Sequence, residues 1–281
     1  MKKVILCMAA VALSGLLVHA RNDAAAEQLG WKLGSQAYTF RALSFFETVD
    51  KLHELGIKYV EMYPGQALKP GVKAKTGPTM TEAETADMQA KLQAAGVKVV
   101  SFGVAPIPDK TETEARRRFA WGKKLGIETF VTETVPTPML DKLSQEYGIK
   151  IALHNHPKTW PSEQVLTACA GLSKNVGSCS DTGHWKRAGH VPVEQLKKLE
   201  GRIIELHFKD VAADGKGKGG YTDRPWGTGE GNVKAMLAEL KRQGFKGHFQ
   251  IEYEHGTVPE LMRDLPLCIE YFDKEAAELA K

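Results

Sequence analysis

Four short segments in the second half of the chain place acid/base or metal-binding residues at the end of a β-type run. In chain order they are IALHNH (151–156), SDTGHW (180–185), ELHFKD (205–210) and FQIEYE (249–254). The C-terminal ends of successive strands converge on one place when the strands form a parallel barrel, and barrel enzymes keep their chemistry there. Asp181, His207 and Glu252 would then bring two carboxylates and an imidazole to one point. That combination suits a divalent cation such as Mn²⁺, Co²⁺, Zn²⁺ or Mg²⁺, and structural salt bridges among the three residues are the alternative.

The rest of the chain supplies the elements that such a barrel needs. From Lys32 onward, strand-like and helix-like stretches alternate, and most of the helix-like stretches stop at a glycine, as helices commonly do. We predict strands at 33–40, 59–64, 97–106, 127–133, 149–157, 176–185, 202–211 and 247–254, each followed by a helix. Eight such units in one chain favour an α/β fold, a single (β/α)₈ TIM barrel, over an open doubly wound sheet.

Two of the connections after predicted strands are long. Residues 66–80 form one, and residues 212–232 form the other, which contains the glycine-rich run GKGKGGYTDRPWGTGEGN. Long loops on the catalytic face of a barrel are candidate lids or substrate-binding loops. A plain surface loop is the alternative for the part rich in glycine and lysine.

The first twenty residues have the order of a secretory signal. Lys2 and Lys3 precede an apolar run over 4–18, and a small residue, Ala20, ends the segment. The apolar run is shorter than the roughly 20 residues that span a bilayer, so we predict cleavage rather than a permanent membrane span. The expected organisation is therefore a signal peptide at 1–20 and a barrel domain at 21–281, in a protein that is exported to the periplasm.

Charge and cysteine content narrow the classes of partner and compartment. The net charge is +4, and the basic residues stand mostly beside acidic ones in helix-like stretches, which argues against a nucleic-acid partner. Cys169, Cys179 and Cys268 lie beyond the signal and lack a metal-type spacing such as CxxC. We expect them to be buried as small apolar residues, with one disulfide as the alternative.

In their order and spacing, four motifs resemble the xylose isomerase-like barrel superfamily, often called sugar phosphate isomerases/epimerases. The motifs are SDTGHW, ELHFKD, DRPWGTGEG and QIEYE. The resemblance covers nearly all of 21–281 and implies a metal held by residues that end strands five to eight, as in ketose 3-epimerases. In this chain those positions hold His154, Asp181, His207 and Glu252.

His154 departs from the family, whose strand-five residue is usually a glutamate that also exchanges a proton with the substrate. The departure argues against a simple epimerisation by two glutamates. Glu133, at the end of the preceding strand, is the candidate for the missing carboxylate, and a salt-bridged surface role is its alternative.

The resemblance also implies roles for several neighbouring residues. His184 matches a family residue that contacts a substrate oxygen or a second metal. Lys209 and Asp210 follow His207 as in inosose dehydratase relatives, where the lysine would polarise a carbonyl and the aspartate would orient the histidine; a plain ion pair is the alternative for either residue. In endonuclease IV a further histidine follows strand seven, but here Pro225 stands there, which argues against a DNA-repair site.

Other residues are candidates for contact with a carbohydrate. Glu61 ends the second predicted strand, and Trp160, Trp185 and Trp226 lie in segments that follow strands. Aromatic faces stack on sugar rings, and local packing is the alternative for each tryptophan.

Together these residues predict an exported, metal-dependent sugar isomerase or epimerase. It would remove a proton next to a carbonyl of a sugar or keto-sugar and form an enediolate whose oxygens the metal holds. Glu252 is the predicted base, assisted by His156 or Glu133, with Lys209 as a further catalytic candidate. The alternatives are a lyase or dehydratase of keto-sugars or 3-keto-glycosides, and a carbohydrate-binding barrel without activity.

Overall fold

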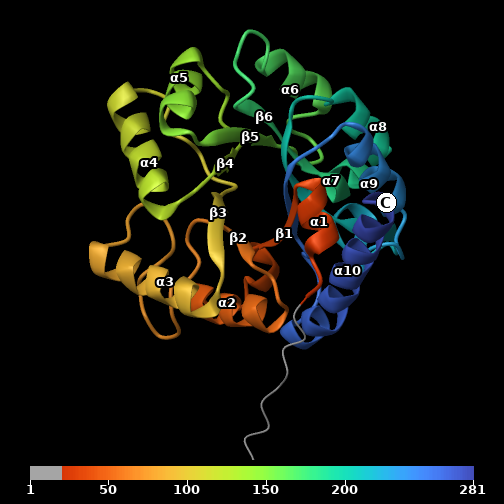
Figure 1. Ribbon diagram of the computed structural model, residues 1–281. Coiled ribbons are helices and arrows are strands. Elements are labelled where there is room, and N and C mark those ends of the chain that lie inside the picture. Colours follow the sequence, from red (N-terminus) through yellow and green to blue (C-terminus); the bar gives the residue numbers. More distant parts are fainter. Residues whose placement is uncertain (1–20) are drawn as a thin grey trace, which may run out of the picture.

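The computed structural model describes residues 21–281, and the predicted signal peptide, 1–20, lies outside the described residues. Eight parallel strands close into a barrel (Figure 1). They are β1 (Trp31–Gln36), β2 (Tyr59–Met62), β3 (Lys98–Phe102), β4 (Thr129–Thr132), β5 (Lys150–His154), β6 (Val176–Asp181), β7 (Ile203–Phe208) and β10 (Gly247–Ile251). Strands β1 to β7 neighbour one another in chain order, and β10 closes the ring between β7 and β1. The predicted (β/α)₈ fold is confirmed.

Helices surround this barrel (Figure 1). They are α1 (Ala24–Leu29), α2 (Phe45–Glu54), α3 (Glu82–Ala95), α4 (Glu112–Leu125), α5 (Pro138–Tyr147), α6 (Ser162–Ala168), α7 (Thr182–Arg187), α8 (Pro192–Lys198), α9 (Val233–Arg242) and α10 (Val258–Leu279). Local signals explain their bounds: Ser44 and Glu47 form a capping box at the start of α2, and Gly96 ends α3 in the left-handed conformation. Within residues 21–281 no helix is both long and apolar enough to cross a membrane.

The sixth strand is shorter than predicted. The expected strand 176–185 stops at Asp181, because the Asp181 carboxylate accepts a hydrogen bond from the His184 backbone N–H at 2.7 Å and caps α7. His184 and Trp185 therefore lie on a helix rather than on a strand. This short helix carries both side chains away from the direction that a continued strand would give them.

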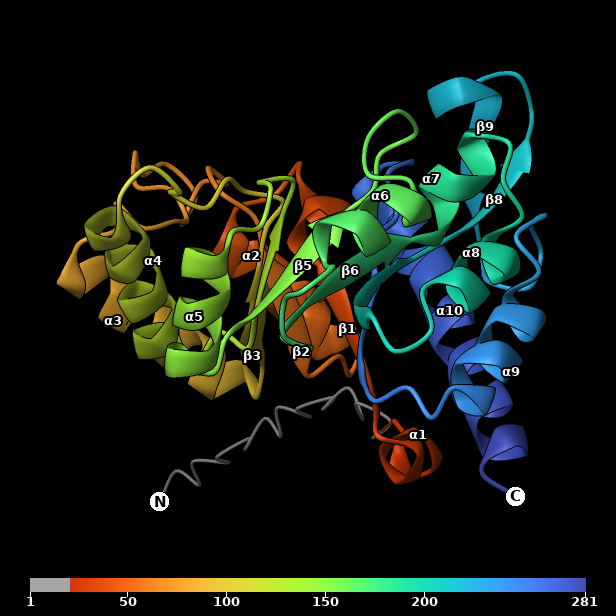
Figure 2. The ribbon, with the colours of Figure 1, turned by 90° about the horizontal axis from the view of Figure 1, so that it is seen from above.

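The long connection after β7 is more ordered than a plain surface loop. Residues Asp210–Ala213 (β8) pair antiparallel with Tyr221–Arg224 (β9), and this hairpin stands beside α7 at one end of the barrel (Figure 2). The Asp210 carboxylate accepts backbone hydrogen bonds from Gly227, Gly229 and Gly231, each at 2.9 Å. Asp210 therefore orders the glycine-rich segment, and the predicted role of orienting His207 is wrong.

Apolar residues fill the space between the strands and the helices, whereas the barrel interior also holds buried polar side chains. Inside the barrel, Glu205 accepts hydrogen bonds from Ser101 at 2.6 and 2.8 Å and from Gln250 at 2.7 Å. Burial raises the pKa of Glu205 to about 8, so this carboxyl is protonated at neutral pH. In the described residues all three cysteines are buried and unpaired, as expected.

Candidate metal centre and active site

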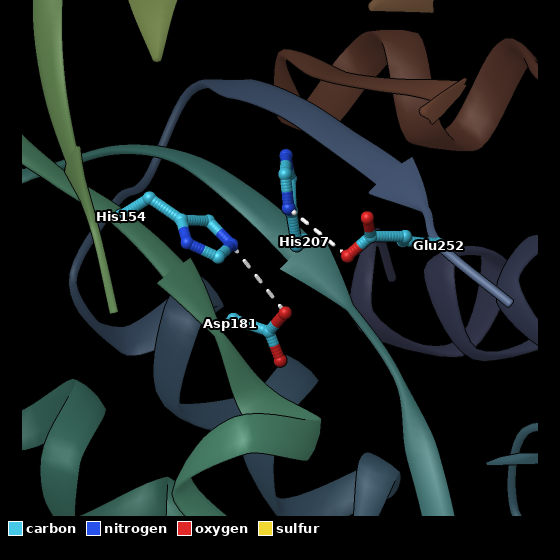
Figure 3. A group of neighbouring side chains, drawn as sticks. All are labelled: His154, Asp181, His207 and Glu252. Carbon is cyan, nitrogen blue, oxygen red and sulfur yellow. Dashed lines mark ion pairs between the residues drawn. The ribbon is translucent and has the colours of Figure 1, made fainter. Parts of the chain in front are cut away.

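Four residues from four strands converge at the C-terminal end of the barrel (Figure 3). His154 ends β5, Asp181 ends β6, His207 lies in β7 and Glu252 directly follows β10. All four are buried, and one potential ligand atom from each lies within 4.8 Å of the others. The barrel thus brings together the four residues that the sequence placed at successive strand ends.

The donor atoms of this group are the kind that a divalent ion satisfies. Asp181 Oδ2 lies 3.5 Å from His154 Nε2, and Glu252 Oε2 lies 3.2 Å from His207 Nδ1. Within the described residues, neither ring nitrogen of His154 has a hydrogen-bond partner, and His207 Nδ1 has none either. Buried polar atoms without partners cost roughly 1–3 kcal/mol each, so the geometry fits a cation held between two imidazoles and two carboxylates.

Glu61 holds the His207 ring in place. Its carboxylate lies 2.7 Å from His207 Nε2 and accepts a hydrogen bond from Gln36 at 3.0 Å. With the proton held on Nε2, the lone pair of Nδ1 faces the centre, an arrangement common among metal-binding histidines. Glu61 is fully buried and is not among the residues that line the cavity, so the structure places it behind His207 rather than on the predicted substrate-contacting wall.

The Lys209 ammonium lies among the carboxylates of the centre. Its Nζ atom is 2.7 Å from Asp181 Oδ2, 2.6 Å from Glu252 Oε2 and 3.2 Å from Glu254 Oε2. Burial acts to lower the pKa of Lys209, but the three carboxylates hold that pKa well above its usual value. Burial likewise acts to raise the pKa of Glu252, and the charge of the Lys209 ammonium holds that pKa well below its usual value. Lys209 therefore forms the ion pairs that the sequence left as the alternative, and it keeps Glu252 ionised.

A cavity of about 370 Å³ opens above this centre. It is lined by Gln36, Tyr38, Tyr63, Pro64, Val104, His154, His156, His184, Glu252 and Glu254. The aromatic wall consists of Tyr38 and Tyr63, whose rings meet edge to face at 5.4 Å. Such a wall can stack on the apolar face of a sugar ring.

The tryptophans predicted to contact a sugar do not line this cavity. Trp226 is buried against Phe208 and Phe272, because the segment ordered by Asp210 folds its indole ring into the core. Trp185 is buried in the same core, and the Trp160 indole N–H donates to the Glu133 carbonyl oxygen at 3.1 Å. The structure therefore favours local packing, the alternative for each tryptophan.

Glu133 and His156 form a pair at the rim of the cavity. Glu133 Oε1 lies 2.9 Å from His156 Nδ1 and accepts a hydrogen bond from Thr159 at 2.6 Å. Glu133 is not one of the four converging residues, so the structure places it outside the candidate metal centre. The His156 ring lies 4.7 Å from the His154 ring and 4.9 Å from the His184 ring, between centroids, so the pair borders the centre without joining it.

His184 contributes a buried imidazole to the cavity wall. Burial lowers the pKa of His184 to about 3, so the ring is neutral at physiological pH. Arg187 Nη1 lies 3.3 Å from His184 Nδ1, and the same guanidinium pairs with Glu254 at 2.5 Å and with Asp223 at 3.3 Å. Because the Arg187 guanidinium donates to Nδ1, the ring proton of His184 is on Nε2, which lies 3.5 Å from Asp181 Oδ2.

Sequence reasoning missed the parts played by Glu254, Arg187 and the two tyrosines. Glu254 stands two residues after Glu252 and so shares its face of the extended chain, a signal that the QIEYE motif carried. Arg187 lies three residues after His184, which places it on the same side of a helix, but the helix itself was not predicted.

This is a closed (β/α)₈ barrel with a candidate divalent-metal centre and a sugar-sized cavity at its C-terminal end, the class of protein that the sequence predicted. The model for the xylose isomerase-like TIM barrel family matches residues 137–272. The crystal structure of an uncharacterized protein from Parabacteroides distasonis is 32% identical, covers 87% of this chain and 99% of its own, and superposes with a TM-score of 0.69. The chain belongs to the xylose isomerase-like TIM barrel family, and the predicted resemblance is confirmed.

Other relatives are more distant or match only in part. A rhizopine catabolism protein of Rhizobium meliloti is 24% identical over 163 residues, 53% of this chain and 46% of its own length. Inosose dehydratase of Clostridium botulinum is 36% identical over 75 residues, 26% of this chain and 25% of its own. The chain thus spans less than half the length of these curated relatives.

Two further solved structures share the fold. One is a xylose isomerase-like TIM barrel protein from Mycobacterium smegmatis in complex with magnesium, at 16% identity, coverage of 90% of this chain and 99% of that one, and a TM-score of 0.68. The other is a D-tagatose 3-epimerase-like protein, at 19% identity, coverage of 89% and 98%, and a TM-score of 0.64. At these identities the likeness concerns the fold alone.

Proposed function

We propose that the protein is a divalent-metal-dependent enzyme that removes a proton next to a carbonyl of a sugar or keto-sugar and returns it to isomerise or epimerise the substrate. The observation that carries this proposal is the convergence of His154, Asp181, His207 and Glu252 at the base of a cavity of about 370 Å³. Such a cavity suits a single sugar unit. A D-tagatose 3-epimerase-like protein shares the fold, but a fold alone does not determine the reaction, so the proposal rests on the site.

The residues that line the cavity suit this chemistry. A divalent ion bound by the four residues would stabilise the negative charge that develops on the carbonyl oxygen of the substrate. Glu252 is ionised and reaches the cavity, so its carboxylate is the proposed base. His184 is a neutral donor whose Nε2–H would hold a substrate oxygen.

The pair of His156 and Glu133 is the proposed second proton-transfer group. Glu133 engages His156 Nδ1, which leaves Nε2 as the ring atom that gives or takes a proton. A proton removed by Glu252 on one side of the cavity and returned by His156 on the other would invert the carbon. This arrangement would supply the second group that His154 does not.

A dehydratase or lyase is the second candidate, and the local identity to inosose dehydratase favours it. Both reactions begin with the same proton abstraction. They diverge when His156 protonates a departing hydroxyl or glycosidic oxygen instead of the carbon.

The substrate is proposed to carry no phosphate. Among the described residues that line the cavity, none is a lysine or an arginine, the side chains that usually hold phosphate. The proposed export through the signal segment 1–20 agrees with this, because phosphorylated sugars are cytoplasmic metabolites.

The test is turnover of a panel of ketoses, keto-sugars and 3-keto-glycosides by metal-loaded protein in heavy water, followed by NMR. Deuterium at the carbon next to the carbonyl, with an epimer or isomer as product, supports the first candidate. An unsaturated product supports the dehydratase or lyase. Binding of sugars without exchange or product contradicts both and indicates a carbohydrate-binding barrel.

A further inference from the structure

The metal centre offers nitrogen and oxygen donors in equal number. His154 and His207 are both buried, and three of their four ring nitrogens lack a hydrogen-bond partner within the described residues. The fourth nitrogen, His207 Nε2, is held by Glu61 at 2.7 Å. Each imidazole therefore has a lone pair available to the centre.

The oxygen donors of the same centre are partly neutralised by the protein itself. Lys209 Nζ lies within 2.7 Å of both Asp181 Oδ2 and Glu252 Oε2, the same oxygens that approach the two imidazoles. An ammonium at this distance reduces the negative potential that attracts any cation. It also competes directly for the carboxylate lone pairs.

These two features affect different ions unequally. Mg²⁺ is held almost entirely by oxygen atoms and charge, and it gives up its water reluctantly. Zn²⁺ and Co²⁺ bind imidazole strongly, so they lose less when the carboxylates are shared with an ammonium. Mn²⁺ lies at the weak end of the affinity order for such sites.

We infer that this centre selects Zn²⁺ or Co²⁺ over Mg²⁺ and Mn²⁺, and that the His154 imidazole is the residue that sets the selection. The inference rests on the metal centre of the proposed function and narrows its cofactor.

The test measures metal affinity and needs no substrate. The full chain without its signal segment is stripped with a chelator, and its affinities for Zn²⁺, Co²⁺, Mn²⁺ and Mg²⁺ are measured by competition calorimetry and native mass spectrometry. Most sites of mixed donors prefer Zn²⁺ to Mn²⁺ to some degree, so the decisive quantity is the change of this preference in a variant. In His154→Glu, the ratio of the Mn²⁺ to the Zn²⁺ dissociation constant should fall at least about tenfold, because a nitrogen donor is replaced by a charged oxygen donor.

A matched control is His248→Gln. His248 is also buried and its Nε2 also lacks a hydrogen-bond partner, but it lies on β10 four residues before Glu252 and outside the cluster. Its replacement should leave the preference unchanged. If His154→Glu fails to fold by circular dichroism, His154→Gln tests the loss of the imidazole without added charge, and the preference should again fall.

The outcomes separate this inference from the proposed function. Binding of divalent ions with a preference that neither His154 variant changes would overturn the inference and leave the metal-dependent function standing. Tight binding of Mg²⁺ by the wild-type protein, equal to that of Zn²⁺, would overturn it as well. No binding of any of the four ions would instead refute the metal centre on which both proposals rest.

Discussion

Replacing Lys209 by methionine should destabilise the metal-free protein strongly and the metal-loaded protein much less. Lys209 Nζ pairs with Asp181, Glu252 and Glu254 at 2.7, 2.6 and 3.2 Å, and none of these side chains is more than 9% exposed. Removing one partner from a buried ionic group leaves uncompensated charge and costs about 3–5 kcal/mol. A methionine side chain fills much of the same volume, so the loss of packing contributes little.

A divalent ion would restore the lost positive charge at the same carboxylates. The assay is urea unfolding of wild type and Lys209→Met, each with excess chelator and with saturating Zn²⁺. We expect the difference in unfolding free energy between the two proteins to shrink by at least half when Zn²⁺ is present, because the ion stabilises the folded variant by binding it. A loss below about 1 kcal/mol without metal, or an equal loss in both conditions, would refute the electrostatic account of this lysine.

Three further predictions concern the pair of His156 and Glu133, the buried His248 in the barrel, and the aromatic side chains. Glu133→Gln should lower the rate of product formation by about 10² to 10⁴, because His156 loses the carboxylate on its Nδ1, while the bound metal, measured by elemental analysis, stays at the wild-type level; lost metal would instead make Glu133 part of the centre. Burial, together with the charges of Lys32 and Lys150, lowers the pKa of His248 to about 3. The neutral ring is therefore fully tolerated in the folded protein above the unfolded pKa of about 6.5, and the unfolding free energy falls by about 2 kcal/mol when the pH is lowered to 5. His248→Gln should remove that part of the pH dependence in urea titrations, and an unchanged slope would contradict the assignment. Trp226→Ala should cost about 3–5 kcal/mol of unfolding free energy and leave sugar affinity intact, whereas Tyr63→Ala should weaken sugar binding in calorimetry; the reverse pattern would return Trp226 to the site.

The residues at strand ends were predictable because the C-terminal ends of all strands in a parallel barrel lie on the same face of the barrel. Period-two alternation places every second residue of a strand inside the barrel, and the C-terminal end of each strand faces the same side. Asp181, His207 and Glu252 meet for that reason, although the sequence could not show that Lys209 would enter the same group. The side chain of Lys209 belongs to the same alternation as His207, so the signal was present but was equally consistent with a surface ion pair.

The depth of a side chain within the barrel was not predictable in the same way. The pairing of β2 with β3 shifts register between Val60 and Glu61, so that Glu61 stands beside Ser101. Register shifts of this kind depend on the neighbouring strand, so they cannot be predicted from the hydrophobic periodicity of one sequence. Glu61 therefore lies beneath the cavity, in contact with His207, where the sequence suggested a residue on its wall.

Loop residues escaped prediction because distant contacts position them. Trp226 packs in the core because three backbone amides of its segment donate hydrogen bonds to the carboxylate of Asp210. The local sequence around Trp226 contains no pattern that predicts this arrangement. The hairpin itself is fixed at its far strand by Asp223, which accepts from the backbone N–H of Glu254 at 3.0 Å. Gly229 and Gly231 let the chain pass close to Asp210, where a Cβ atom at either position would collide with the carboxylate.

The charges around the centre explain how a neutral imidazole can occupy the fourth ligand position. Asp181, Asp223, Glu252 and Glu254 supply four negative charges, and Lys209 and Arg187 supply two positive ones, so this buried group carries two net negative charges. A carboxylate in place of His154 would raise the net charge to three negative in a site with little water to screen it, and the metal-free protein would lose stability. With the imidazole, the two net negative charges equal in magnitude the charge of one divalent ion. The choice among ions then depends on which donor atoms face the centre more than on total charge, and that choice is what the His154 variants measure.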